Sequence, residues 1–271
     1  MNTRLSIPRV VSSMLVVGLA SVFALPLVWL LLAAFVPTSR WGAWGPLPDP
    51  ASVSLTNFAT FFGAVRAGVY LANSLFVAGI AVLSQWYIAS LSGYAIARHG
   101  FVGKRLLVGV LLVLLVLPGE LLLAPQYRTV QSLGLIDTTA GLVLPWTVNA
   151  LGVLYFARVC SMIPEGTLEA ARLDGAGEWR THWTIAVPLT RPASCAFCLI
   201  AFITSWNGFL WPSIALHRDE LFTLPLGISQ MFNGYREDYG ALMAGTLLSV
   251  IPPIVVLALL QRGMRTRASN A

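Results

Sequence analysis

Side chains that could carry out covalent chemistry are few in this sequence and lie far apart. His99, His182 and His217 fall in separate segments, without the spacing of a metalloprotease or hydrolase motif. The glycine-lysine cluster at residues 100–105 lacks the spacing of a phosphate-binding P-loop and the Ser or Thr that follows its lysine. We therefore expect no catalytic residue, no metal site and no cofactor in this chain, and a membrane enzyme is a minor alternative.

The three cysteines include a C-x-x-C pair, Cys195 and Cys198, inside an apolar run, while Cys160 stands apart from them. Redox or metal chemistry needs thiolates with access to water, whereas a free cysteine is often a small buried apolar residue. The sequence therefore favours three unreactive thiols.

Noncovalent binding of a polar solute inside a membrane is a second possible chemistry. Polar groups at membrane depth are costly, so they face other helices or a water-filled cavity. Sugars bind to amide and carboxylate groups, with an aromatic ring below the apolar face of the sugar. The residues that offer these groups, and that we take as the candidate translocation path, are Glu120, Asn149, Trp206 and Asn207. The alternative is that the amides, including Asn73, Gln85 and Gln126, only bond neighbouring helices.

The composition indicates which elements position these groups. Of the 271 residues, 57% are hydrophobic and only 10% are charged, far below the roughly 25% of soluble domains. The net charge of +6 comes from Lys and Arg that flank apolar runs and form no basic stripe, so nucleic-acid binding is not expected. The uncharged residues 10–39 exceed the roughly 7 to 15 residues of the apolar region of a signal peptide and should form a first transmembrane helix. The sequence therefore predicts an all-α integral membrane protein surrounded by lipid.

Six transmembrane helices can be counted between charged positions, since a span needs roughly 20 apolar residues. They are expected at residues 10–36, at 69–97, from 106 onward, and within 137–158, 191–217 and 238–262. The third span meets Pro118, Gly119 and Pro125, so it is either broken or ends early. Residues 37–68 should form an external loop with Trp41 and Trp44 as interfacial anchors.

The basic residues indicate the orientation of these spans. With both termini in the cytoplasm, twelve of the 17 Lys and Arg residues lie inside, and five lie outside. Cytoplasmic loops carry an excess of Lys and Arg, so the N-in, C-in orientation is favoured. An even number of spans agrees with it.

The predicted cytoplasmic loop between spans four and five, residues 158–191, holds four basic and four acidic residues on two short helical patterns. Pro164 suits the first turn of a helix, and Gly175 suits its end. A second helix should follow with three apolar residues on one face, namely Trp179, Trp183 and Val187. The loop is therefore expected to be an ordered element.

The sequence of this loop resembles the EAA loop of permease subunits from binding-protein-dependent ABC importers. The similarity rests on Glu169-Ala170-Ala171, then Asp174-Gly175-Ala176, and then Ile185 with Pro188-Leu189. The stretches GYAIARHGFVGKR, WNGFLWPSIAL, LFTLPLGISQMF and YGALMAGTLLSVIPPIVVLALLQR are similar to the maltose- and glycerophosphate-type branch. The closing GMRTRASNA departs from the small-residue tail of that branch, so no tail contact is carried over.

The resemblance implies a subunit of a bacterial inner-membrane importer for a sugar or sugar-like solute. Its implied partners are ATP-binding subunits, which would hold ATP and Mg²⁺, a second homologous permease and an extracytoplasmic substrate-binding protein. It also implies that a helix over about residues 164–175 inserts into a groove of the ATPase. The candidate coupling residues are Glu169, Ala170, Ala171, Arg172, Asp174, Gly175 and Ala176.

The same resemblance divides the chain into three parts. Residues 1–68 would hold the first span and its external loop, residues 69–262 the permease core, and residues 263–271 a short cytoplasmic tail. A secondary transporter or channel subunit is the main alternative. It should show matching broken helices in two halves, whereas the sequence indicates one break, at residues 118–125.

Overall fold

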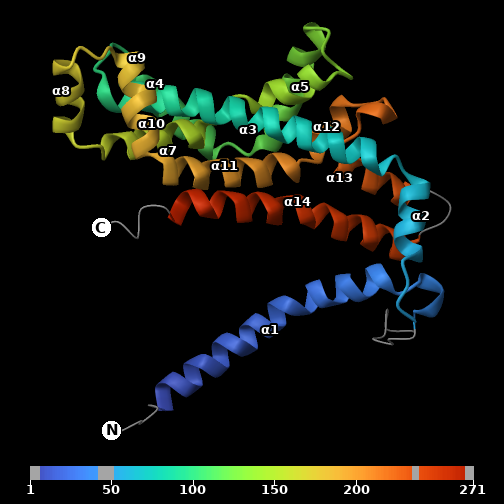
Figure 1. The fold of residues 1–271 in the computed structure, drawn as a ribbon. Coiled ribbons are helices and arrows are strands. Elements are labelled where there is room, and N and C mark those ends of the chain that lie inside the picture. The colour runs from blue at the N-terminus through green and yellow to red at the C-terminus, as the bar shows by residue number, and fades with distance from the viewer. Residues whose placement is uncertain (1–6, 42–51, 234–237, 266–271) are drawn as a thin grey trace. The chain divides into compact units, whose positions relative to one another are not determined.

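The computed structural model describes residues 7–41, 52–233 and 238–265, and this described part contains helices, turns and short loops but no strand. The predicted all-α class is therefore confirmed. The α-helices are α1 (Ile7–Phe35), α2 (Thr56–Ala64), α3 (Ala67–Arg98), α4 (Lys104–Val116), α5 (Leu123–Ser132), α6 (Thr139–Val143), α7 (Ala150–Ser161), α8 (Glu165–Leu173), α9 (Glu178–Thr181), α10 (Val187–Leu189), α11 (Arg191–Trp206), α12 (Leu210–Ala215), α13 (Leu224–Ser229) and α14 (Tyr239–Arg265), as labelled in part in Figure 1. The 3-10 turns are η1 (Thr38–Arg40), η3 (Gly119–Leu122), η4 (Leu144–Trp146), η6 (Asp219–Leu221) and η7 (Gln230–Asn233), and η5 (His182–Ala186) is a π-helical turn.

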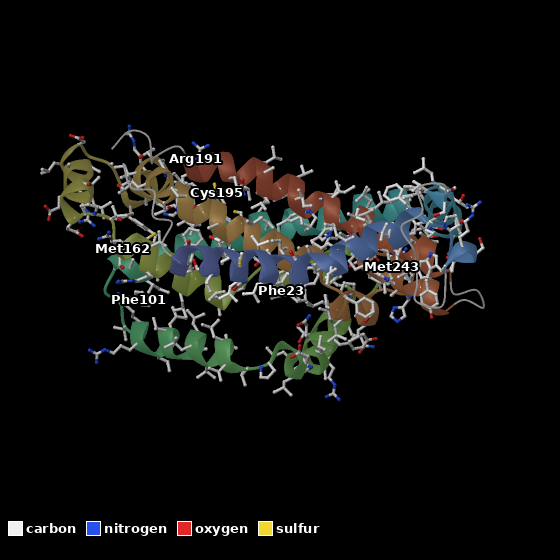
Figure 2. All side chains as sticks on the ribbon, turned by 90° about the horizontal axis from the view of Figure 1, so that it is seen from below. Phe23, Phe101, Met162, Arg191, Cys195 and Met243 are labelled. Atoms are coloured by element: carbon white, nitrogen blue, oxygen red, sulfur yellow. The ribbon has the colours of Figure 1, made fainter. Side chains whose placement is uncertain are left out.

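Three helices in the described part are long and apolar enough to cross a membrane: Val11–Phe35 of α1, α3, and Tyr239–Gln261 of α14. Three pairs of shorter helices pass the same criterion together, so the number of crossings is up to six if each bent pair is one span. Apolar side chains along the long helices, such as Phe23 on α1, stand out from the ribbon (Figure 2).

The predicted break in the third apolar run is present. Lys104–Val116 and Gly119–Ser132 meet at an angle of 106°. Pro118 causes the break, because a proline disfavours the helical conformation of the residue before it, and Leu117 is extended with ψ 123°. The chain restarts in η3, and this restart places Glu120 beside the bend.

Contacts divide the chain into two compact units, which are described separately. The first comprises Met1–Ala67 and Ile228–Val250. Asn57, which is 3% exposed, donates hydrogen bonds of 3.0–3.1 Å to three carbonyls at the end of α1, those of Ala33, Ala34 and Val36. These carbonyls have no partner within their own helix, so one amide caps α1 and fixes α2 against it.

The second unit comprises Gly68–Gly227 and Ile251–Ala271. Its apolar interior joins α3, α4, α7 and α11 through a cluster of Ala89, Ile96, Leu111, Val153, Phe156, Phe197 and Ala201. Helices α3 and α7 approach closely at Gly93, where a Cβ atom would lie only 2.5 Å from Cβ of Phe156. A residue without a side chain is therefore required at this crossing.

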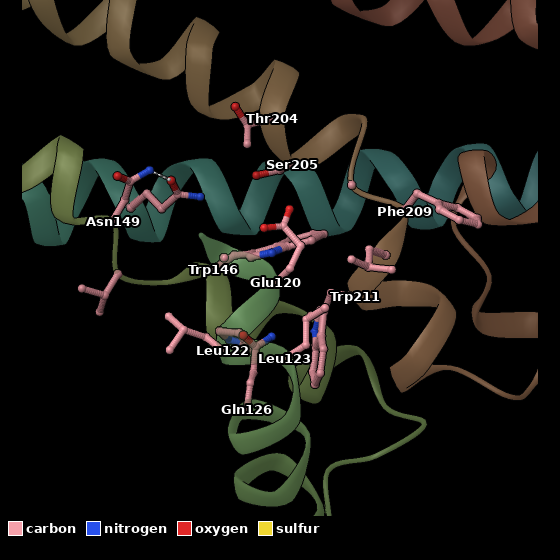
Figure 3. Close-up of a pocket in the computed structure, with 16 residues that line it drawn as sticks. Glu120, Leu122, Leu123, Gln126, Trp146, Asn149, Thr204, Ser205, Phe209 and Trp211 are labelled. Carbon is pink, nitrogen blue, oxygen red and sulfur yellow. Dashed lines mark hydrogen bonds between the residues drawn. The ribbon is translucent and has the colours of Figure 1, made fainter. Parts of the chain in front are cut away.

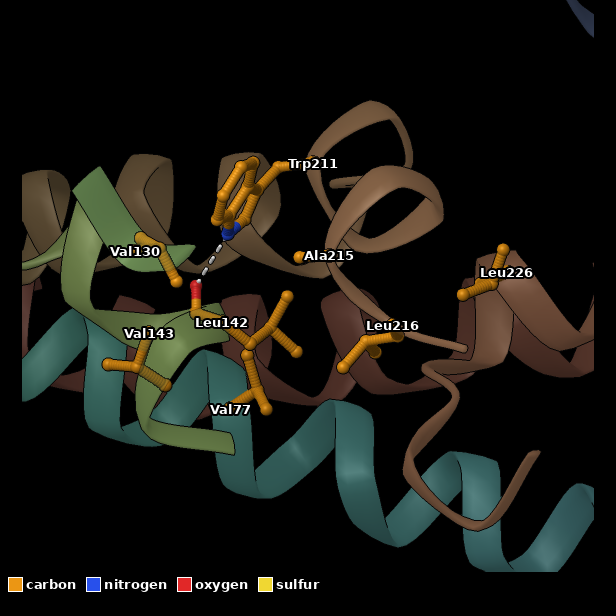
Figure 4. Close-up of a cluster of buried hydrophobic side chains, with 8 residues drawn as sticks. All are labelled: Val77, Val130, Leu142, Val143, Trp211, Ala215, Leu216 and Leu226. Atoms are coloured by element: carbon orange, nitrogen blue, oxygen red, sulfur yellow. Dashed lines mark hydrogen bonds between the residues drawn. The ribbon is translucent and has the colours of Figure 1, made fainter. Parts of the chain in front are cut away.

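A second cluster in the same unit lies at the other end of α3. It comprises Val77, Val130, Leu142, Val143, Trp211, Ala215, Leu216 and Leu226 (Figure 4). The Trp211 indole N–H donates to the Leu142 carbonyl at 3.2 Å, which satisfies its polar atom inside an apolar environment. Within this unit, α8 to α10 lie at one end of α3, and α12 and α13 lie at the other (Figure 1).

Some predictions fall outside the described residues. These include the role of Trp44 as an interfacial anchor and residues 266–271 of the predicted tail. Trp41 is described, and its indole N–H donates to the Val36 carbonyl at 2.9 Å. The division of the chain at residues 68 and 262 stays a prediction.

Candidate functional site

Helix α8 begins after Pro164 and ends in a Schellman motif. The amide of Gly175 donates to the Arg172 carbonyl at 3.0 Å, and the amide of Ala176 donates to the Ala171 carbonyl at 2.9 Å. Gly175 has φ +77°, a left-handed conformation that glycine adopts without strain. The structure therefore confirms the predicted helix and its stop at Gly175.

The two faces of α8 have different roles. Leu168 is fully buried and Ala171 is 5% exposed, so these residues hold the helix against the rest of its unit. The other candidate coupling residues are exposed or partly exposed: Glu169, Ala170, Arg172, Asp174, Gly175 and Ala176. The exposed candidate coupling residues are therefore polar or small, and the small ones permit close approach of a second surface.

The second half of the loop, α9 to α10, packs its aromatic residues on α3. Trp183 stacks on Tyr87 with ring centroids 5.7 Å apart and lies 5.9 Å from Trp86. Trp179 and Trp183 are neighbours at 5.7 Å, as expected for two residues on one helical face. Glu178–Leu189 and Arg191–Trp206 then meet at 80°, so the loop ends at Arg191 as predicted.

Three large apolar side chains on this loop remain exposed. Met162 is 62% exposed, Leu173 is 89% exposed and Trp179 is 61% exposed. Met162 lies at the same end of the unit as α8 (Figure 2). Sequence reasoning did not single out Met162 and Leu173 as candidate contacts, although an apolar residue beside the charged positions of α8 was a usable signal.

A cavity of about 450 Å³ lies at the bend of the broken span (Figure 3). Its lining comes from α3, from η3 and α5, from η4 to α7, and from α11 to α12. The polar and aromatic lining residues are Gln85, Glu120, Gln126, Trp146, Asn149, Thr204, Ser205, Phe209 and Trp211. Carboxylate, amide, hydroxyl and indole groups therefore converge on one space.

The four predicted path residues are divided by the structure. Glu120 and Asn149 line the cavity. Trp206 is 1% exposed and stacks on Phe202 with ring centroids 5.6 Å apart, so it belongs to the interior of its unit. Asn207 caps the end of α11 and is absent from the lining, although both Ser205 and Gly208 contribute to it.

Asn149 also forms a hydrogen bond between helices, which was the alternative to a role in solute binding for the amide side chains. Its amide nitrogen donates to Gln85 at 3.0 Å, and its side-chain oxygen accepts from the backbone of Gly152 at 3.1 Å. The same residue therefore begins α7, joins α7 to α3 and lines the cavity.

The indole rings of the cavity belong to Trp146 and Trp211, which sequence reasoning did not propose for this role. Gly208 makes room for the first ring, because a Cβ atom at position 208 would lie 2.6 Å from the Trp146 indole. Trp146 and Glu120 extend into the same part of the cavity (Figure 3). The signal available in the sequence was Pro145 beside Trp146 in the fourth apolar run, where the 3-10 turn η4 replaces the α-helix.

Glu120 is the one ionisable residue among the described residues that line the cavity, and no Lys, Arg or His contributes. A carboxylate accepts hydrogen bonds from hydroxyl groups and repels anions. The cavity therefore suits a neutral polar solute better than an anion.

Comparisons with known proteins agree with this geometry. Residues 87–270 match the family described as binding-protein-dependent transport system inner membrane component. The arabinooligosaccharides transport system permease protein AraQ of Halalkalibacterium halodurans is 30% identical over 261 residues, which cover 93% of each chain. The sn-glycerol-3-phosphate transport system permease protein UgpE of Yersinia pestis is 34% identical and covers 72% of this chain and 70% of its own.

The fold is also shared with a solved structure, that of a bacterial ABC transporter involved in the import of the acidic polysaccharide alginate. The TM-score is 0.80 at 19% sequence identity, over 96% of this chain and 99% of the other. The family match covers more than half of the chain and includes all of the loop at residues 158–191. The chain therefore belongs to the family of binding-protein-dependent transport system inner membrane components.

Proposed function

We propose that this chain is the transmembrane permease subunit of a bacterial ABC importer and forms half of the translocation path for a sugar or sugar-like solute. The observation that carries the proposal is that one compact unit holds both parts such a subunit needs. These parts are a cavity lined by Glu120, Asn149, Trp146 and Trp211, and an ordered loop with an exposed polar helix. Binding groups and a docking element are thus built on the same helices.

The proposed partners follow from the exposed loop and from the family. ATP-binding subunits would dock on α8, hold ATP and Mg²⁺ and carry out the hydrolysis, so this chain is itself no enzyme. Exposed Leu173 and Trp179 supply apolar contacts beside Glu169 and Arg172, a composition suited to an interface with a polar rim. A second permease would complete the path, and an extracytoplasmic binding protein would deliver the solute.

The proposed solute is a neutral sugar. Relatives of this chain are named for neutral and for anionic solutes, since one is named for arabinooligosaccharides and another for sn-glycerol-3-phosphate. The lining of this cavity carries one carboxylate and no basic residue in its described part, which favours the neutral class. A thermal-shift screen of the cognate binding protein against neutral oligosaccharides and glycerophosphodiesters tests the choice, and stabilisation by the phosphodiesters alone would overturn it.

The proposed topology has six spans with both termini in the cytoplasm of the bacterial inner membrane, and the α8 loop between spans four and five inside. It rests on the distribution of basic residues and on the three long helices and three bent pairs. Cysteines at Gly103 and Glu220 test it, because the first should resist a membrane-impermeant maleimide added outside and the second should react. A cysteine at position 103 that reacts with the maleimide in intact cells would contradict the topology. Positions 43 and 267 are equally suitable by sequence but lie outside the described residues.

A secondary transporter or channel subunit is the competing function, and affinity purification separates the two. An importer subunit should retain an ATPase with nucleotide-binding motifs and a second homologous permease in stoichiometric amounts. Solute uptake by this chain alone in proteoliposomes, without any ATPase, would support the competing function and overturn the proposal.

A further inference from the structure

Helix α3 is the longest helix of its unit, with 32 residues and no break. At about 1.5 Å per residue it is roughly 48 Å long. Its two ends and its middle each carry a separate set of polar contacts to other elements. We propose that α3 is the rod that carries movement of the coupling loop to the cavity, and that Arg98 is the positioning residue that fixes the loop to this rod; the inference rests on the proposed function.

Arg98, the last residue of α3, joins three helices. Its guanidinium donates to the Glu165 carboxylate at 2.8 Å and to the backbone carbonyls of Cys160 and Ile163. Cys160 lies in the last turn of α7 and Ile163 follows that helix, while Glu165 is the first residue of α8. The Arg98 side chain is 8% exposed whereas that of Glu165 is 55% exposed, so the charge-assisted bonds to the two carbonyls are the better shielded from water.

A second tie joins the far end of α8 to the same turn of α3. Glu178 accepts a hydrogen bond from the Tyr94 hydroxyl at 3.1 Å and lies 3.6 Å from Nε2 of His99. Arg172 lies 3.4 Å from both Glu178 and Glu165, through two different guanidinium nitrogens. These pairs are about half exposed, and exposed ion pairs contribute little. The contacts of Arg98 therefore hold the loop to α3 more strongly than those around Glu178 do.

The middle of α3 reaches the cavity. Gln85 lies thirteen residues before Arg98, a separation of about 20 Å along the helix. It is 5% exposed, bonds Asn149 and lines the cavity. A continuous hydrogen-bonded helix bends little over this length, so a displacement of Arg98 moves Gln85 and its partner.

The opposite end of α3 holds the segment that follows α12. Asn73 donates to the carbonyls of Glu220 and Phe222 at 2.8 and 3.1 Å, and the Ser74 hydroxyl accepts from the amide of Leu224 at 2.7 Å. One rod thus contacts the loop, the cavity and the segment at the far side of the cavity. Coupling between distant sites requires such a physically continuous element, although continuity alone does not prove it.

The test uses the assembled importer in lipid nanodiscs, with the three native cysteines replaced by alanine and Gln126→Cys as a cavity reporter. The measured quantity is the rate of reaction with a water-soluble maleimide, without nucleotide and after trapping with Mg-ATP and vanadate. The two rates should differ in the reporter chain. With Arg98→Ala the difference should be lost while the complex stays assembled, and Arg98→Lys, which keeps the charge but not the planar donors, should restore part of it.

Arg158→Ala is the matched control, because Arg158 is an exposed arginine at the same end of the unit. It should keep the full nucleotide-dependent difference. If Arg98→Ala does not assemble, Arg98→Gln, which removes the charge and most of the donors with a smaller loss of volume, takes its place and should reduce the difference.

The outcomes distinguish a failure of the role of α3 from a failure of the proposed function. A nucleotide-dependent difference that persists undiminished in the assembled Arg98→Ala complex, or in the Arg98→Gln complex if that one is used, overturns the role of α3. No difference in the reporter chain itself overturns the proposed function, and the inference falls with it.

Discussion

Substitutions of Gly175 separate the backbone demand of the loop from the approach of a partner. Gly175 has φ +77°, and a Cβ atom built on it meets nothing within 4 Å. In this chain alone, a substitution therefore costs only left-handed backbone strain, roughly 1–2 kcal/mol for an ordinary L-residue. Asparagine tolerates this conformation better. Gly175→Ala and Gly175→Trp should then destabilise the end of α8 by similar amounts, and Gly175→Asn by less.

The ATPase complex should rank the same variants differently. A strain of roughly 1–2 kcal/mol lowers the population of the native loop end by about 5- to 30-fold at most. If a partner surface approaches Gly175, the tryptophan variant also pays for steric exclusion, which the alanine variant largely avoids. We therefore expect retention of the ATPase subunit to fall from glycine to asparagine to alanine, and then much further to tryptophan.

Two measurements in nanodiscs decide this prediction. Hydrogen exchange of residues 170–176 in the isolated chain measures the backbone effect, and the dissociation constant of the ATPase subunit measures the docking effect. Equal dissociation constants for the alanine and tryptophan variants would show that no surface approaches Gly175. Glycine-like values for every variant would show that this loop is not the coupling element.

Three further predictions concern other parts of the chain. Gly93→Ala should lower the free energy of unfolding by roughly 1–3 kcal/mol in thermal unfolding, because the new Cβ would overlap Phe156. Gly109→Ala is the control and should not lower it, because position 109 faces open space. Equal effects of the two substitutions would refute the close crossing of α3 and α7. Glu120→Gln should change transport but not the amount of complex, whereas unaltered transport would exclude Glu120 from the path. Burial raises the pKa of Asp137, but hydrogen bonds from two backbone amides and an arginine outweigh it and hold the pKa below that of a free aspartate. Its stabilisation should be present near neutral pH and lost as the pH falls through this lowered pKa, and an unchanged acid profile in Asp137→Asn would contradict this.

The sequence by itself determined that the helices of this protein face lipid, and where single residues break or end a helix. Long uncharged runs cannot be buried in a chain of this size, so they predict lipid-facing helices whatever the packing. Pro118 and Gly175 impose their effects on the backbone through their own covalent structure, and both the break and the helix stop lie where the sequence placed them. Such features depend on neighbours within a few residues.

Only the tertiary structure decided which side chains meet. Trp206 and Trp146 are both tryptophans in apolar runs, yet the first is buried against Phe202 and the second lines the cavity. The difference depends on how each helix is rotated about its axis, and packing of distant segments sets that rotation. Arg98 and Glu165 are 67 residues apart, and neither position indicates its partner in the sequence. Their contact exists because α3, α7 and α8 pack together, and the physical link between the loop and the cavity follows from that packing.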